Sequence, residues 1–118
     1  MRVRVFIRRK IEEGKDTEAF RLLKKIRLNA MEYEGYISGE TLVRTNDPQE
    51  IMVISTWQNM EDWNSWKESE DRKTIDALLE ELQTMPTLYE SFVISKYRLH
   101  AKTGFADQLW IRSPRPAR

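Results

Sequence analysis

Aromatic side chains suited to holding a flat ligand are concentrated just past the middle of the chain. Trp63 and Trp66 follow Met60 at helical spacing, and Trp57 lies a few residues earlier, at the end of an apolar run. An indole face can stack on a planar ring, and Trp66 is the candidate for such a pocket wall. Aromatic residues at this spacing pack into a protein core more often than they bind ligands, so core packing is the competing interpretation for each tryptophan.

Carboxylates and an amide close to these tryptophans are the polar candidates. Asp62 lies on the same helical segment, Asn59 is placed to cap that segment, and Asp76 lies ten residues beyond Trp66. An aspartate can serve as a base when burial raises its pKa, whereas an exposed aspartate on a helix has no such role. Both interpretations stay open for Asp76.

Other kinds of site are excluded by what the chain lacks. It has 118 residues and no cysteine, which excludes disulfides, thiolate metal sites, iron–sulfur clusters and a cysteine nucleophile. The single histidine, His100, excludes a cage of several histidines within one chain and leaves a serine triad without a nearby base. The four glycines do not cluster into a phosphate-binding loop. We predict no metal site.

The composition predicts a cytoplasmic protein that binds neither nucleic acid nor membranes. Hydrophobic residues make up 40% of the chain and charged residues 33%, with a net charge of +1. No apolar run approaches the ~20 residues of a membrane span. Residues 1–5 alternate between apolar and basic side chains, as a strand does and a signal peptide does not.

The hydrophobic pattern predicts four strands and two helical regions. Strands are expected at 3–10, 36–44, 51–57 and 88–99, where apolar residues alternate or run together. One helix is expected after a cap at Asp16 or Thr17. The other region lies between Asn59 and Pro86, as two helices or one kinked helix. A turn at 45–48 predicts that the second and third strands form a hairpin.

Two apolar stripes mark the helix faces that are expected to pack on the sheet. Their members are Ala19, Leu22, Leu23, Ile26 and Ala30 in the first helix, and Ile75, Leu78, Leu79 and Leu82 in the second region. Arg27 lies off the first stripe and is expected in solvent. The basic cluster at residues 8–10 is suited to meeting an anion, but solvent is the preferred interpretation for it as well.

This order of elements predicts an α+β, ferredoxin-like βαββαβ sandwich with an antiparallel sheet. Both helices would cover one sheet face. The other face also carries apolar residues, including Phe6 and part of the run at 51–54. Leaving apolar surface wet costs roughly 25 cal/mol per Å², and a second copy of the sheet is the simplest cover. We therefore expect a homodimer. The domain is predicted at residues 1–99, and the tail at 100–118 would cross to the partner subunit or fold back on its own.

Three segments of the chain match a known sequence pattern. Residues 35–42 (GYISGETL) open the second predicted strand, and residues 54–66 (ISTWQNMEDWNSW) end the third strand at a tryptophan and continue into a helix with two more. Residues 69–73 (SEDRK) follow. These segments resemble the antibiotic biosynthesis monooxygenase (ABM) domain family over residues 3–99. The resemblance implies a dimeric α+β barrel whose members include cofactor-independent oxygenases of polycyclic aromatics and quinols, and haem-degrading oxygenases.

The functional positions of the family are matched only in part. The helix tryptophan that contacts haem in the haem-degrading members corresponds to Trp66. Their haem-ligating histidine corresponds to Asp76, and a carboxylate is a poor replacement for an imidazole on haem iron. Their strand asparagine falls at Phe6 and Ile7. The asparagine implicated in the oxygenases of polycyclic aromatics falls at Asp62.

Three functions follow as hypotheses. The first is a cofactor-independent monooxygenase in which each subunit of a homodimer binds a planar aromatic or quinol. The second is haem binding or degradation, with His100, Tyr36, Tyr97 or a methionine as the axial ligand. The third is a non-catalytic dimer that binds a small ligand. The candidate catalytic residues are Trp66, Asp62 and Asp76, and the candidate ligand-binding residues are Phe6, Asn59, Trp63 and Leu79.

Overall fold

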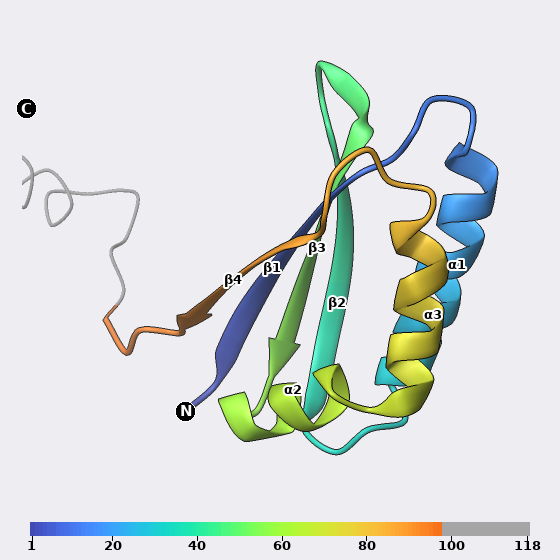
Figure 1. The fold of residues 1–118 in the computed structure, drawn as a ribbon. Helices are drawn as coiled ribbons and strands as arrows, with labels where there is room; N and C mark the ends of the chain where they lie inside the picture. The colour runs from blue at the N-terminus through green and yellow to red at the C-terminus, as the bar shows by residue number, and fades with distance from the viewer. Residues whose placement is uncertain (98–118) are drawn as a thin grey trace, which may run out of the picture.

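The structure is a computed structural model that describes residues 1–97, and it contains the expected βαββαβ order with the second helical region divided in two (Figure 1). The elements are β1 (Val3–Lys10), α1 (Asp16–Ala30), β2 (Tyr36–Arg44), β3 (Asp47–Trp57), α2 (Met60–Lys67), α3 (Glu70–Glu80) and β4 (Leu88–Val93). The α+β, ferredoxin-like prediction is confirmed. The tail predicted at 100–118, with His100, lies outside the described residues.

The four strands form one antiparallel sheet in the order β2-β3-β1-β4. The central pair, β1 and β3, places Val5 opposite Ser55, and Ser55 in turn pairs with Gly39 of β2. α1 and α3 run along one side of this sheet, and α2 lies at its lower end (Figure 1). The predicted hairpin of β2 and β3 is confirmed, with its turn at Thr45 and Asn46. The space between helices and sheet is therefore the place where a site can be enclosed.

Two predicted strand boundaries are wrong. β3 begins at Asp47, four residues earlier than expected, because the hairpin continues to a pair between Asp47 and Arg44. β4 ends at Val93 and does not reach residue 99. Its neighbour explains this, because Val93 pairs with Val3 and β1 begins at Val3. Beyond that pair, the Ile94 backbone N–H donates to the carbonyl of Arg2, which precedes β1, at 3.0 Å, and the described residues 95–97 form no strand.

The core lies between the sheet and the apolar faces of α1 and α3. All five residues of the predicted α1 stripe are buried. In α3, Ile75 and Leu79 are buried as predicted, but Leu78 is 43% exposed, so its place in the stripe is a wrong prediction. Arg72 is buried instead, because it lies three residues before Ile75 and seven before Leu79, on the same helix face. A charged residue thus occupies a core position.

Short capping contacts separate α2 from α3. The side chain of Asn59 accepts a hydrogen bond from the Asp62 backbone N–H at 2.8 Å, and so caps α2. Ser69 lies between the two helices. Its hydroxyl accepts from the Arg72 backbone N–H at 3.4 Å and donates to the Trp66 carbonyl at 2.7 Å. These contacts fix where Trp66 and Arg72 project from the helix ends.

The face of the sheet opposite the helices is left uncovered by the described residues. Strand register places six apolar side chains on it: Phe6, Leu42, Met52, Ile54, Leu88 and Phe92. Phe6 packs edge-on against Phe92, with ring centroids 5.5 Å apart. In residues 1–97, no helix has the length and apolar character that crossing a membrane requires.

Candidate functional site

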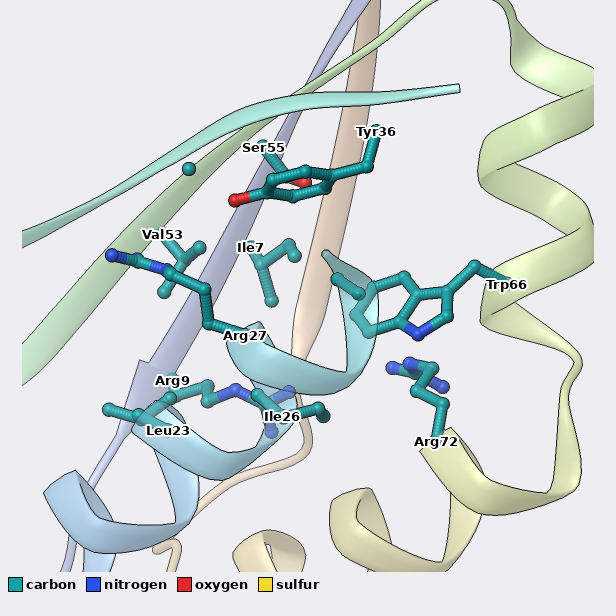
Figure 2. Close-up of a pocket in the computed structure, with 12 residues that line it drawn as sticks. Ile7, Arg9, Leu23, Ile26, Arg27, Tyr36, Val53, Ser55, Trp66 and Arg72 are labelled. Carbon is teal, nitrogen blue, oxygen red and sulfur yellow. The ribbon is translucent and has the colours of Figure 1, made fainter. Parts of the chain in front are cut away.

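A pocket lies between the sheet and the helices, beside Trp66 (Figure 2). Its polar lining comes from Arg9, Arg27, Tyr36, Ser55, Trp66 and Arg72, and every helix and three of the strands contribute residues to it. The cavity volume is about 30 Å³, and the empty space counted with its opening to solvent is about 450 Å³. A cavity of this volume has room for about two water molecules. A ring-sized ligand must therefore also occupy the opening or displace a side chain.

Trp66 forms a fixed wall of this pocket. The residue is 4% exposed, and its indole N–H donates to the side-chain oxygen of Asn29 at 2.8 Å. The ring stacks on Trp57 with centroids 5.4 Å apart and an angle of 26° between the planes. The guanidinium carbon of Arg72 lies 5.5 Å from the ring centre, within the range of a cation–π contact. These neighbours fix the orientation of the indole.

Arg9 is the most deeply held charge at the site. Its side chain is 3% exposed, and its Nη2 lies 2.9 Å from the Asp76 carboxylate. Nη1 donates to Gln83 at 2.9 Å and to Thr87 at 3.1 Å. The expectation that residues 8–10 all lie in solvent is therefore wrong for Arg9. The strand alternation that buries Val5 and Ile7 also turns Arg9 toward the helices.

Arg72 approaches the same carboxylate from α3. Its side chain is 5% exposed, and its Nη2 lies 3.5 Å from Asp76. Nη1 donates to the Lys67 carbonyl at 3.1 Å, and Nη2 also donates to the Tyr89 hydroxyl. Burial raises the pKa of the Tyr89 phenol, and the positive charge of Arg72 partly opposes that shift. Two buried guanidinium groups thus share one carboxylate.

Arg27 and Tyr36 are half-buried side chains of the lining (Figure 2), and we call the part of the pocket between them its mouth. Both side chains lie close to Gly39. Arg27 was expected in solvent, and that prediction is wrong: its Nη2 donates to the Thr41 hydroxyl at 2.5 Å. Burial raises the pKa of the Tyr36 phenol, and the positive charge of Arg27 partly opposes that shift. A Cβ on Gly39 would lie 2.6 Å from the Tyr36 hydroxyl oxygen and 3.1 Å from Arg27 Nε. Glycine is therefore needed there for these two side chains to lie where they do.

The predicted polar candidates lie behind or beside the pocket. Asp76 forms the ion pairs with Arg9 and Arg72 and lies behind them, outside the lining. Asn59 and Asp62 lie at the start of α2, where Asn59 caps the helix. The Asp62 side chain packs so tightly against Gly35, which has φ +89°, that a Cβ there would collide with it. Of the predicted catalytic residues, Trp66 lines the pocket.

The predicted ligand-binding residues lie in three different surroundings. Trp63 belongs to the aromatic cluster beneath Trp66, with its ring 5.7 Å from that of Trp66 and 6.0 Å from that of Trp57. Leu79 is fully buried in the core. Phe6 lies on the opposite face of the sheet, against Phe92. The structure therefore places none of these three in the lining of the pocket.

The arginines are the site residues that the sequence interpretation missed. Their signals were present, because Arg9 continues the inward alternation of β1 and Arg72 lies on the buried stripe of α3. Hydropathy alone assigned such residues to solvent. In residues 1–97, no group of three or more His, Cys, Asp or Glu side chains is arranged to hold a metal ion.

Comparison with known proteins agrees with this architecture. The family model described as "Antibiotic biosynthesis monooxygenase" matches residues 2–78. No curated protein is significantly similar to the chain. A conserved protein from Methanosarcina mazei is 20% identical with a TM-score of 0.74, and the match covers 78% of this chain and 91% of that one.

Two further solved structures bear on the family. SnoaB, a cofactor-independent oxygenase from Streptomyces nogalater, is 12% identical with a TM-score of 0.73, over 81% of this chain and 95% of that one. A putative antibiotic biosynthesis monooxygenase from Nitrosomonas europaea is 11% identical with a TM-score of 0.72, over 77% and 88%. At these identities the structural matches show a shared fold. The family match over residues 2–78 covers more than half of the chain, and so this chain belongs to the antibiotic biosynthesis monooxygenase family.

Proposed function

We propose that this protein is an oxygenase that needs neither metal nor organic cofactor and acts on a planar aromatic or quinol bound beside Trp66. The observation that supports this most directly is the pocket between sheet and helices. Apolar side chains line it together with Arg9, Arg27 and Arg72. Pockets of this kind, apolar with a few convergent polar groups, are typical of small-molecule sites. Membership of the family and the shared fold with SnoaB point in the same direction.

The reaction requires only the substrate and dioxygen. Loss of a proton leaves an electron-rich anion, and its electron pair forms a carbon–oxygen bond to dioxygen, which gives a hydroperoxide after protonation. At a CH₂ carbon, loss of water then leaves a carbonyl, so one oxygen atom enters the product and the other leaves as water. The substrate supplies all four electrons. The protein contributes positioning, exclusion of water and stabilisation of the anion.

Each group at the pocket has a part in that scheme. Trp66 holds the plane of the ring, because Asn29 and Trp57 fix the indole. The guanidinium groups stabilise the substrate anion as it forms. Asp76 is assigned a positioning role, since its carboxylate holds Arg9 at 2.9 Å from behind the pocket.

Entry of a ring requires the mouth to open. Arg27 and Leu23 line both this pocket and a second hollow, whose other lining residues are Phe20, Lys24 and Thr41. Within residues 1–97, the Arg27 guanidinium has one side-chain hydrogen-bond acceptor, Thr41. Rotation of Arg27 would join the two spaces, which gives a planar substrate a route in.

Haem does not fit the described site. Asp76, at the position where haem-degrading members carry their axial histidine, is engaged by two arginines. Tyr36 lines the pocket, but burial raises its pKa, which opposes the phenolate form that binds iron. A haemin titration checks this: without a Soret shift at stoichiometric haemin, the haem hypothesis ends.

We also propose that the protein is a homodimer whose subunits pack through the uncovered sheet face. Phe6 and Phe92 pack against each other on that face, and Phe92 is 55% exposed within the single chain. A second copy related by a two-fold axis would bury the same residues from both subunits.

Oxygen uptake with candidate substrates tests the oxygenase. The probes are an anthrone and a naphthohydroquinone, and uptake is measured with an oxygen electrode alongside product analysis. Trp66→Phe removes the bond to Asn29 and part of the pocket wall, and we expect uptake to fall about tenfold or more. Trp63→Phe is the matched control, because it alters the same aromatic cluster outside the pocket lining.

The outcomes separate the alternatives. Equal uptake by Trp66→Phe and wild type would refute the role of Trp66. Binding of either probe without oxygen uptake would instead support the non-catalytic ligand-binding module.

A further inference from the structure

We propose that this pocket selects ligands that carry an anionic oxygen group, a carboxylate or an ionised phenol, and binds that group between Arg9 and Arg72, with Arg27 at the mouth. The inference specifies the substrate class of the pocket in which the proposed oxygenation takes place. It rests on charge, burial and unused hydrogen-bond donors at one site (Figure 2).

Positive charge is in excess at the pocket. Three guanidinium groups line it, and among residues 1–97 no carboxylate does. Asp76 is the carboxylate that pairs with both Arg9, at 2.9 Å, and Arg72, at 3.5 Å. One negative charge cannot neutralise two buried cations, and an uncompensated buried charge is unfavourable. An anionic ligand would supply the missing charge.

Unused donors are present on the same side chains. The buried Nε atoms of Arg9 and Arg72 have no hydrogen-bond acceptor within residues 1–97. Buried polar groups in folded proteins almost always have a partner, and a buried donor without one is unfavourable. Carboxylate oxygens accept such hydrogen bonds strongly. These atoms are sealed from solvent, so an oxyanion bound at the pocket becomes their partner when the surrounding side chains move aside.

The two arginines are held in place before any ligand arrives. Gln83, Thr87 and Asp76 bind the terminal nitrogens of Arg9 from behind. Lys67, through its carbonyl, and Tyr89, through its hydroxyl, bind those of Arg72. A site whose donors are already oriented loses little conformational entropy on binding, which favours affinity and selectivity.

The shape of the pocket suits a small anionic group joined to a flat ring. The cavity of about 30 Å³ is lined by Arg9, Arg27 and Arg72 and is open to solvent. Ile7, Ile26 and Val53 line the same pocket and provide apolar contacts for a ring that extends toward the opening. Arg27 at the opening adds a third positive charge.

Binding under nitrogen tests the inference without any turnover. The probe is 2-naphthoate, compared with 2-naphthylmethanol, which has the same ring and no charge. Binding is measured by calorimetry and by quenching of tryptophan fluorescence. We expect 2-naphthoate to bind about tenfold or more tightly than the alcohol, because charge-assisted hydrogen bonds are the stronger ones. Equal affinity for the two compounds would overturn the proposal.

2-Naphthol distinguishes the two sources of the anion. Its affinity is measured at pH values on either side of its own ionisation. Tighter binding of the ionised form would show that a phenolate is accepted, whereas tight binding of naphthoate alone would restrict the ligand to carboxylates. Either result supports an anion site.

Variants assign the effect to the pocket. Arg27→Gln and Arg72→Gln should each weaken naphthoate binding about tenfold and leave the affinity for the alcohol within about twofold. Arg21→Gln is the matched control, because Arg21 lies on α1 with Arg27 but pairs with Glu18 on the exposed surface. If Arg72→Gln fails to fold, the proposal is tested by Arg27→Gln and by the comparison of naphthoate with the alcohol on the wild type. Losses equal to that of Arg21→Gln would overturn the proposal.

The result is separable from the proposed oxygenation. Preference for naphthoate in a protein that consumes no oxygen with any probe would leave the anion site standing and remove the oxygenase. Oxygen uptake together with equal binding of the charged and neutral compounds would support the oxygenase and refute the anion site.

Discussion

At the scale of single residues, the site depends on how a buried carboxylate is shared. Asp76 is 18% exposed at its side chain and contacts two guanidinium groups that are almost fully buried. Replacing a buried pair by apolar groups is often neutral, but removing one partner leaves a charge without compensation. Asp76 therefore contributes to the stability of the fold, although its position next to Ile75 on α3 suggests only an exposed helix acid.

Substitution of Asp76 tests this dependence. We expect Asp76→Asn to lower the free energy of unfolding by about 3 kcal/mol, measured by urea denaturation, because Arg9 and Arg72 lose their shared counter-charge. Glu68→Gln is the control, since Glu68 pairs with Lys73 at 3.1 Å on the exposed surface and should change stability by less than about 1 kcal/mol. Similar losses in the two variants would contradict the assignment.

At the scale of elements, one residue of α1 joins the three helices. The side-chain oxygen of Asn29 accepts from Trp66 of α2 at 2.8 Å, and its amide nitrogen donates to Asp71 of α3 at 2.9 Å. The Tyr33 hydroxyl donates to the same carboxylate at 2.8 Å. The orientation of Trp66 is therefore connected to the first turn of α3. Because this connection runs through the Asp71 carboxylate, we expect its contribution to stability to depend on pH.

Acid should weaken the connection between the helices. The hydrogen bonds from Asn29 and then Tyr33 lower the pKa of Asp71 to about 2, from 3.8. A carboxyl whose pKa is lowered by folding stabilises the fold above its unfolded value, and that contribution is lost as the pH falls through the folded value. We expect the urea midpoint of the wild type to exceed that of Asp71→Asn at pH 5, and the difference to shrink between about pH 4 and pH 2. A difference that is constant over this range would contradict the assignment.

The elements themselves were largely predictable, whereas the charged part of the site was not. Periodicity located β1 and the α1 stripe, because one buried face leaves a clear repeat in the sequence. The pairing of Arg9 with Asp76 joins residues 67 positions apart, and no local pattern indicates such a partner. Alternation predicts a last strand that continues past Val93, but the length of β4 is set by the neighbouring strand. Trp66 could be predicted as a pocket residue because the spacing of the tryptophans is visible within a short stretch of sequence.

At the scale of the whole molecule, the sheet has two unequal faces. One carries the helices and the pocket, and the other presents Phe6, Phe92 and four further apolar side chains beside charged ones. Exposed apolar patches of this kind often mark interaction surfaces. The homodimer proposed above would use this face and leave the pocket and its opening on the helix side.

Disruption of the sheet face tests the dimer. We expect Phe92→Glu to convert a dimer to a monomer in size-exclusion chromatography with light scattering, because it introduces a charge beside Phe6 where two sheets would meet. Leu28→Glu is the control: Leu28 lies on α1 and is exposed to a similar extent, 53% against 55%. A wild type that is monomeric at working concentrations, or a Phe92→Glu protein that stays dimeric, would refute this interface.

The grouping of Trp57, Trp63 and Trp66 also has an optical consequence. Their ring centres lie 5.4 to 6.0 Å apart, so the electronic transitions of the three indoles couple with one another. Such coupling gives a paired positive and negative band in ultraviolet circular dichroism, and its amplitude depends on the angles between the rings. The protein thus contains its own spectroscopic reporter, able to register a small rotation of one indole when the neighbouring pocket fills.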